Sequence, residues 1–440
     1  MQFVQQGNKS LSFKILRIAG LNYSLAVDKL NSKFNKFADL TYADQQKHIF
    51  DLCLVYGDSF SKGMNRLGCD AHEIIHDVDS LQIAWARENN YKINFSDKNW
   101  KSLLVLEQIR QAKPEVVFFQ DLHSLPSIYR NQIKVIAPSV KMIVLHKGYP
   151  SHYEELNDFD LILMSMPSLV DMCKSRGINA DLHYHGFNTN VNKFVTNNFD
   201  KISTGNYTFI GSSGFGHGDG HRTRYWNLCQ LFNKTPLNGY IEEQFSNKNI
   251  NFNFLKDNFI ANKNYKASVT LLVKLLRDNL KKYFNDHFVI RKILMQVESN
   301  LLDYNAMPKF PIAQLFPNKC NPPVFGVEMY EKFISTQFTL NMHADATGDS
   351  VGNLRMFEAT GVGACLLTND GPNMNELFKK DIEVVTYKDN NDCLDKIQYL
   401  LANPRVCEEI GRSGQLRTLK DHTIEKRTEK LFYILQSNFK

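Results

Sequence analysis

The sequence has no hydrophobic run long enough to cross a membrane. None of its stretches approaches 18 consecutive apolar residues, and the N-terminal segment MQFVQQGNKSLSFK has no apolar core of a signal peptide. We therefore expect a soluble, cytoplasmic protein with at most peripheral membrane contact.

Cysteine is present but never in the spacing of a metal site. The eight cysteines are scattered along the chain, and no C-x-x-C pair occurs. This pattern is typical of free thiols in a reducing compartment, and it argues against a zinc site or a disulfide framework.

Dense blocks of basic residues are also absent. The net charge of +6 is spread over 52 basic and 46 acidic side chains. Nucleic acid is therefore not an expected partner, although a local basic site for an acidic ligand remains open. The chain is 43% hydrophobic and 22% charged, as globular proteins are, and its 440 residues suffice for two domains.

Short apolar runs alternate with amphipathic segments through the first half of the chain. The runs predict strands, and the segments between them predict short helices. Alternation of this kind indicates an α/β fold with a parallel sheet. The strands are expected at 13–18, 71–75, 116–119, 142–145, 161–164 and 180–184, and the helices at 58–67, 100–111 and 168–176.

Polar side chains follow two of these strands directly. Ligands of parallel sheets bind outside the carboxyl ends of the strands, so these residues are expected on a cleft wall. An imidazole titrates near neutral pH, which makes His146 the candidate general base or acceptor contact. Loop histidines without a role are the alternative for His123 and His146. The acceptor-side candidates are Gln120, His123, Lys147 and Tyr149.

A second round of alternation follows a polar, Asn-rich stretch at 188–206, which predicts a linker. It opens with a strand at 207–210 and a loop from Gly211 to Gly216, a second possible phosphate or sugar site. Further on, the sequence predicts a mostly helical stretch at 252–304, a loop at 308–323, a strand at 382–387, and helices at 393–401 and 423–437.

The segment 341–368, NMHADATGDSVGNLRMFEATGVGACLLT, carries the main site prediction. It shows a loop rich in Gly and Asp, a short helix ending at Gly361, and a buried strand at 364–368. Asp349 or Ser350 is expected to cap the helix. The unpaired N–H groups of the first turn and the positive end of the helix dipole suit a diphosphate.

Two features of this junction point to an anionic ligand. Gly348 and Gly352 are expected to let a ligand approach the backbone. Arg355 lies in the first turn, where a cation is unfavourable unless an anion is present. An ordinary capped helix with a solvated arginine is the alternative.

The second half resembles the C-terminal domain of GT-B glycosyltransferases, in particular the spore-maturation CgeB-like group. The matching residues are GNLRMFEA at 352–359, G-x-GA-x-LLT at 361–368, ELF at 376–378, YLLANP at 399–404 and HT at 422–423. The first half agrees more loosely, through KPEVV at 113–117, HKGYP at 146–150 and HGF at 185–187.

The resemblance implies a GT-B fold with two Rossmann-like domains facing across a cleft. Residues 1–190 would bind the acceptor, residues 206–420 would bind the nucleotide sugar and carry the helical insertion at 252–304, and residues 421–440 would cross back to the first domain. The protein would be a bacterial glycosyltransferase of cell-envelope polysaccharide synthesis, and a homo-oligomer is possible.

The family pattern also implies a donor site. Glu358 corresponds to the glutamate that binds the donor ribose and is counted with His146 as catalytic; its two oxygens suit two vicinal hydroxyls. Gly352, Asn353, the backbone of Leu354 and Arg355 fall where the diphosphate is held. Gly211 and Ser212 match the glycine loop beneath the donor, and His343 is expected to touch the sugar or phosphate, with a structural role as the alternative.

The implied activity is transfer of a sugar from a nucleotide-diphosphate or nucleotide-monophosphate sugar to a glycan, protein or cell-envelope acceptor, without metal or cofactor. Many retaining members carry a second glutamate eight positions before the first, where this chain has Ser350, so the stereochemical outcome is open. Asp77-Val78-Asp79 and Asp158-Phe159-Asp160 raise a metal-dependent alternative. Such triplets are common by chance in a chain with this many acidic residues, and Asp77-Val78-Asp79 could simply cap the helical stretch that follows it, which argues against a metal role.

Two other functions fit the same fold. A nucleotide-sugar 2-epimerase would use the donor site without an acceptor. A non-catalytic nucleotide-sugar or glycan-binding module would need no phosphate-facing arginine beside a ribose-facing carboxylate, which argues against it.

Overall fold

A computed structural model describes residues 12–21, 36–54, 57–150, 152–195, 203–215, 221–243 and 310–439. Two six-stranded sheets are present, in the orders β2-β1-β3-β4-β5-β6 and β12-β11-β10-β7-β8-β9. Each strand pair whose register is described is parallel. The predicted α/β fold with parallel sheets is confirmed, while the helical insertion predicted at 252–304 lies outside the described residues.

The chain divides into two compact units. Met1–Thr204, Val324–His343 and Thr347–Lys440 form the first, and Gly205–Pro323 with Ala344–Ala346 form the second. The segment that carries most of the predicted donor site therefore belongs to the same unit as the N-terminal sheet. The domain boundaries expected from the sequence remain a prediction.

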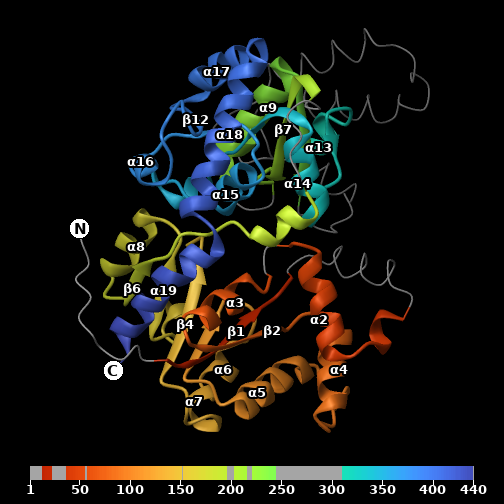
Figure 1. The fold of residues 1–440 in the computed structure, drawn as a ribbon, viewed down its shortest axis with the longest axis vertical. Helices are drawn as coiled ribbons and strands as arrows, with labels where there is room; N and C mark the ends of the chain where they lie inside the picture. Colours follow the sequence, from red (N-terminus) through yellow and green to blue (C-terminus); the bar gives the residue numbers. More distant parts are fainter. Residues whose placement is uncertain are drawn as a thin grey trace, which may run out of the picture. The chain divides into compact units, whose positions relative to one another are not determined.

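The first half of the chain alternates strands and helices as expected (Figure 1). Its elements, in chain order, are β1 (Lys14–Ala19), η1 (Phe37–Asp39), α2 (Tyr42–Asp51), α3 (Ser59–Arg66), β2 (Asp70–Ile75), α4 (Asp79–Glu88), α5 (Trp100–Ala112), β3 (Val116–Phe119), α6 (Ser127–Arg130), α7 (Ile133–Ile136), β4 (Met142–Lys147), η2 (Tyr153–Leu156), β5 (Leu161–Met164), α8 (Pro167–Lys174), β6 (Ala180–Leu182) and η3 (Thr189–Lys193).

The N-terminal sheet is buried on both faces. Successive residues of a strand point to opposite faces, and here both sets are apolar. Val117 and Phe119 join a cluster with α5, α7 and α8, whereas Val116 and Phe118 join a cluster with α3 and α19 (Ile424–Asn438). Helices on both faces explain why β3 reads as one unbroken apolar run.

The last helix packs against the N-terminal sheet through Leu431, Phe432 and Leu435. Figure 1 shows α19 beside α3. The start of α19 is joined to the HGF segment, because Phe187 N–H donates to His422 O at 2.8 Å and Ile424 N–H donates to Phe187 O at 2.9 Å. Two short motifs that resemble the family, HGF and HT, therefore meet as one structural junction.

The remaining elements form the second sheet and its helices. In chain order they are β7 (Ser203–Ser212), α9 (Arg222–Lys234), β8 (Leu237–Glu242), α13 (Ile312–Leu315), β9 (Cys320–Asn321), α14 (Gly326–Ile334), β10 (Thr336–Leu340), η6 (Asp345–Thr347), α15 (Leu354–Gly361), β11 (Leu366–Asn369), α16 (Met374–Leu377), β12 (Val385–Tyr387), α17 (Asn390–Ala402), α18 (Pro404–Asp421) and α19.

The linker predicted at 188–206 contains the boundary between the two compact units, which falls after Thr204, and its described part includes η3 and the start of β7. At its start, Asn188 Oδ1 accepts from Ser59 Oγ at 2.7 Å and from Asn190 N at 3.1 Å. Two expectations about loops were wrong. Gly211 and Ser212 continue strand β7 and do not belong to the following loop. The loop predicted at 308–323 contains α13 and β9.

Within the described residues, no helix combines the length and the apolar character needed to cross a membrane.

The contact between α3 and α19 depends on the absence of a side chain at Gly63. A Cβ added at Gly63 would overlap Thr428 Oγ1 and come within 3.1 Å of Thr428 Cβ. We expect Gly63→Ala to lower the free energy of unfolding by about 1–3 kcal/mol, as overpacking does, despite the better helix propensity of alanine. Urea unfolding measures this, and adding Thr428→Ala to Gly63→Ala should restore part of the loss. Equal stability of Gly63→Ala and wild type would contradict the close packing.

Candidate functional site

The candidate donor site is built at the carboxyl end of β10 and the first turn of α15. Asn353 is the N-cap of α15, with extended backbone at φ −64° and ψ 155°, and its side chain makes no capping bond. The expected caps were wrong. Ser350 Oγ instead accepts a hydrogen bond from Ser168 N at 3.2 Å, at the start of α8.

His343 covers the start of this helix. Its Nε2 lies 3.1 Å from Gly352 N and 3.4 Å from Asn353 N, so it accepts both N–H groups. The proton of the neutral ring is then on Nδ1. The N–H groups of Leu354 and Arg355 follow in the same turn and have no acceptor within the helix. The structure therefore brings His343 to the N-terminal end of α15.

A pair of amides fixes the N-cap residue. Asn353 Nδ2 donates to Asn341 Oδ1 at 2.8 Å, and Asn341 Nδ2 donates to Asn353 Oδ1 at 3.0 Å and to Thr368 Oγ1 at 2.9 Å. Asn341 is 3% exposed and follows β10 directly. The sequence analysis did not single it out, although a polar residue directly after a buried strand is the signal used for Gln120.

Arg355 and Glu358 form an ion pair one turn apart on α15. Arg355 Nη1 lies 2.6 Å from Glu358 Oε2, and Glu358 is 3% exposed. Burial raises the pKa of Glu358, whereas Arg355 and a hydrogen bond from Tyr330 lower it. Arg355 also contacts the sulfur of Met329 and lies over the Phe333 ring on α14. The anion that offsets a cation in the first turn is therefore the chain's own Glu358.

The two glycines of the loop accommodate neighbouring protein groups. Gly352 has a φ of +142°, and a Cβ there would lie 2.9 Å from the Tyr184 ring and 3.1 Å from Ser165 O. Gly348 has a φ of +71° and faces Ser168. The expectation that these glycines leave space for a ligand is therefore corrected for the structure as described.

Asn373 holds the same loop from the other side. Its Nδ2 donates to Tyr184 Oη at 2.9 Å and to Val351 O at 2.7 Å, and its Oδ1 accepts from Val351 N at 2.9 Å. The loop before α15 is thus fixed by contacts with residues that follow β6 and β11.

His146 is buried at the end of β4 and is 4% exposed. Its Nδ1 lies 2.7 Å from Gln120 Nε2 and its Nε2 lies 2.9 Å from His183 O, so one nitrogen accepts and the other donates. Burial lowers its pKa to about 4. In this arrangement neither nitrogen is available to a substrate proton, and its role as a base remains a prediction.

Two other histidines adjoin His146. The ring centroids of His183 and His185 lie 5.1 Å and 4.9 Å from that of His146, and burial holds both pKa values well below the usual range. The sequence analysis noted HGF at 185–187 only as a family segment. Both histidines lie on the segment that follows β6, two strands away from β4 in the sheet, so the spacing along the chain does not reveal this contact.

The other acceptor-side candidates are less enclosed. His123 is exposed, and its N–H donates to Asp121 Oδ1 at 2.9 Å. Lys147 and Tyr149 are half-buried, and burial lowers the pKa of Lys147 while Glu155 and Asp121 raise it. Of this group, the structure brings Gln120 and His146 into direct contact.

Gly211 and Ser212 belong to the second compact unit. They form the carboxyl end of β7, where Ser212 Oγ accepts from Gly214 N at 3.1 Å. Their role beneath a donor stays a prediction.

The carboxylates of the two D-x-D triplets have protein partners. Asp77 Oδ1 accepts from Leu21 N at 2.9 Å, and Asp79 pairs with Lys101. Asp158 pairs with Arg130 at 2.9 Å, and Asp160 pairs with Lys134 at 2.8 Å. Val78 is the N-cap of α4, so the idea that the first triplet caps this helix through its side chains was wrong. Across the described ranges, no group of three or more His, Cys, Asp or Glu side chains is arranged to hold a metal ion.

Comparison with known proteins finds one family model and several solved structures that are similar to this chain. Residues 302–432 match the model of a family described as glycosyl transferase-like. No curated protein is significantly similar to the chain in sequence. Among solved structures, Anabaena HepE in complex with UDP and glucose is 10% identical with a TM-score of 0.54, covering 97% of this chain and 100% of that one.

Two further structures of Anabaena HepE agree. The complex with UDP-glucose gives the same identity, TM-score and coverage. The complex with UDP is 11% identical with a TM-score of 0.52, covering 96% of this chain and 100% of that one. The fold is GT-B. This confirms the expected fold class, and the family model covers the segment that builds α15 and its loop.

The buried histidines predict a pH dependence of stability. The pKa of His146 is about 4 in the folded chain and higher when exposed, so the unfolded state binds more protons between these values. Stability should fall as the pH falls from about 6.5 to 4, by about 3 kcal/mol for this group. Urea unfolding across this range should show a smaller loss in His146→Gln. His123→Gln, at an exposed position, should behave as wild type, and identical pH profiles of all three would contradict the assignment.

The Arg355–Glu358 pair predicts that removing the cation lowers the stability much more than removing the anion does. Arg355→Met leaves a buried carboxylate without its cation, which is expected to cost about 3–5 kcal/mol of stability. Glu358→Gln should cost less at neutral pH, because the charge left unpaired is that of Arg355, whose side chain is 21% exposed against 5% for Glu358. Chemical unfolding measures both variants. Arg110→Met removes a pair of the same i, i+3 spacing from the surface of α5 and serves as the control. A loss no larger than in that control would show that Glu358 does not depend on Arg355.

Proposed function

We propose that this protein is a glycosyltransferase that moves a sugar from a nucleotide-sugar donor to a glycan, protein or cell-envelope acceptor, without a metal ion. The observation that carries the proposal is the construction of α15. Its helix N-terminus, the half-buried N-cap residue Asn353, and the Arg355–Glu358 pair lie within the segment that matches the glycosyl transferase-like family.

The donor would be held by its diphosphate and its ribose. The N–H groups of Leu354 and Arg355 and the helix dipole favour a diphosphate, which stabilises the leaving group without a metal. Glu358 would accept hydrogen bonds from the ribose hydroxyls, through the oxygen lone pairs that Arg355 and Tyr330 do not use. The complexes of Anabaena HepE with UDP and UDP-glucose make a uridine donor the first to test.

Membership in the CgeB-like group belongs to this proposal. The segments of the sequence that resemble that group support it. The acceptor side is proposed at Gln120, His123, Lys147 and Tyr149. Of these, Gln120 and His123 follow β3, Lys147 ends β4, and Tyr149 follows β4. His146 is proposed as the residue that positions Gln120 there, because the two side chains are bonded at 2.7 Å.

Donor binding is tested by calorimetry and thermal shift with UDP, UDP-glucose and a panel of other nucleotide sugars in EDTA. We expect one nucleotide to bind the wild type in the micromolar range, with binding weakened about tenfold or more in Glu358→Gln and in Asn353→Ala, which lose charged or amide hydrogen bonds.

Glu107→Gln on α5 provides the matched control, since this residue also pairs with an arginine three positions away. It should bind nucleotide as the wild type does. If no nucleotide binds the folded wild type, or if binding is unchanged in both site variants, the proposed donor site is wrong. Conversion of the nucleotide sugar without any acceptor would favour the 2-epimerase.

A further inference from the structure

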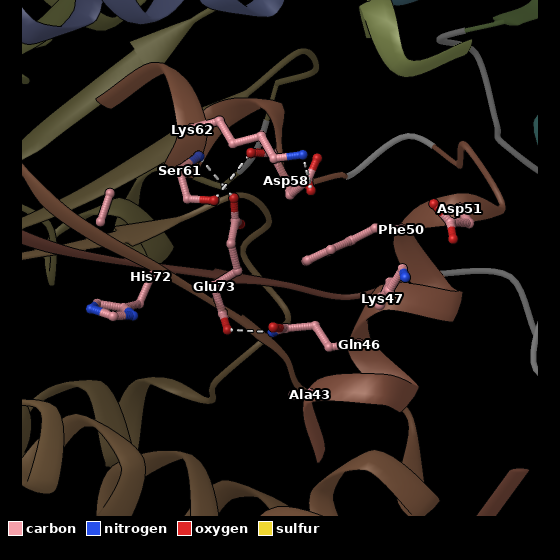
Figure 2. Close-up of a pocket in the computed structure, with 11 residues that line it drawn as sticks. Ala43, Gln46, Lys47, Phe50, Asp51, Asp58, Ser61, Lys62, His72 and Glu73 are labelled. Carbon is pink, nitrogen blue, oxygen red and sulfur yellow. Dashed lines mark hydrogen bonds and ion pairs between the residues drawn. The ribbon is translucent and has the colours of Figure 1, made fainter. Parts of the chain in front are cut away.

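A separate cavity lies in the N-terminal half, between α2, α3 and the edge strand β2 (Figure 2). Its volume is about 340 Å³, at the lower end of the range of small-molecule sites. In the sheet order β2-β1-β3-β4, this cavity borders the edge strand, whereas the proposed acceptor-side residues follow β3 and β4. The cavity is therefore distinct from the sites described above.

The floor of the cavity is a buried charge held rigidly in place. Glu73 is 8% exposed, and its Oε2 accepts from Arg17 Nε at 2.5 Å while its Oε1 accepts from Ser61 N at 3.0 Å. Figure 2 shows the carboxylate of Glu73 directed towards Ser61, with a dashed line between the two residues. Two carboxylate oxygens offer about four acceptor positions, so this floor retains capacity for donors from a ligand.

The edge of β2 is closed to another strand. Asn65 Oδ1 accepts from Ala71 N at 2.8 Å, and Gln46 Nε2 donates to Glu73 O at 2.9 Å. Side chains therefore occupy backbone groups that a peptide strand would need. Addition of a peptide as a further strand is excluded, and a small molecule is the remaining kind of occupant for the cavity.

The charges around the cavity cancel. Three carboxylates, of Asp51, Asp58 and Glu73, line it, together with the ammonium groups of Lys47 and Lys62. Arg17 neutralises Glu73 from behind, and Lys62 pairs with Asp58. Lys47 and Asp51 have no ion-pair partner among the described residues. A lining with balanced charge gives no net attraction to an anion or a cation.

The same lining is rich in hydrogen-bonding groups and has one apolar wall. Carboxylates accept from hydroxyl groups, ammonium groups donate to them, and the ring of Phe50 offers a surface for C–H groups. We propose that this cavity binds a neutral saccharide. That this saccharide is a distal part of the acceptor rests on the proposed function. The binding of a saccharide in the cavity does not depend on it.

Saturation-transfer NMR with methyl α-D-glucopyranoside, methyl α-D-galactopyranoside and maltotriose tests the proposal on the full chain, with inorganic phosphate and glycine as charged probes. Ala43 is exposed on α2 and lines the cavity, so Ala43→Trp fills it without entering the core. We expect a saccharide to bind the wild type and its signal to fall about tenfold in Ala43→Trp and in Asp51→Asn, through loss of space and of a charged hydrogen bond.

Asp395→Asn on α17 and Lys420→Met on α18 are exposed controls of the same chemistry and should bind as the wild type does. Failure of all three saccharides to bind, equal binding in Ala43→Trp, or selective binding of phosphate or glycine would overturn the proposal. Nucleotide binding is measured on the same samples. Saccharide binding without nucleotide binding would leave this inference standing and reject the donor site, and the reverse result would reject only the inference.

Discussion

The burial of one carboxylate governs the arrangement around α15. Glu358 is 3% exposed inside the protein, and an ionised carboxylate there needs a cation and hydrogen-bond donors. Arg355 from the preceding turn and Tyr330 from α14 provide them. Because Arg355 also lies against Phe333, the pair holds α14 and α15 together. The first turn of α15, and with it Asn353, is thereby fixed before any ligand arrives.

Much of the fold follows from hydrophobic patterning. An unbroken apolar run such as Val116–Phe119 predicts a strand that is covered on both faces. The structure shows this run as β3, which is buried on both faces of the sheet. The short helix η3 was not predicted, because the residue at its start, Asn188, is held by Ser59, which is distant in the sequence. Helix α18 was not predicted. It lies close to other backbone, where Gly411 meets Gly363 O, and such contacts leave no periodic signal in the sequence.

The candidate site was predictable in its location but not in its internal pairing. The order of strand, Gly-rich loop and helix predicts a helix N-terminus that follows the carboxyl end of a strand, and the structure has α15 after β10 in this order. Arg355 pairs with Glu358 from the next turn of the same helix, and the burial of that pair depends on Tyr330 from α14. The partners of Gly352 and His146 come from other segments, as the Tyr184 ring and the His183 carbonyl. A glycine that makes room for a tyrosine and one that makes room for a phosphate look the same in a sequence.

The position of His343 constrains how an anion can reach this site. An N–H group directed at one acceptor is not shared equally with a second, and Nε2 already accepts those of Gly352 and Asn353. Two N–H groups at the start of α15 are therefore satisfied inside the protein, while those of Leu354 and Arg355, which come next in the helix, have no acceptor within it. A phosphate bound at the proposed donor site would either use these two N–H groups or take the place of the imidazole, whose Nε2 would then be released. His343 thus acts as a neutral acceptor for the helix end, in the way that a capping side chain does.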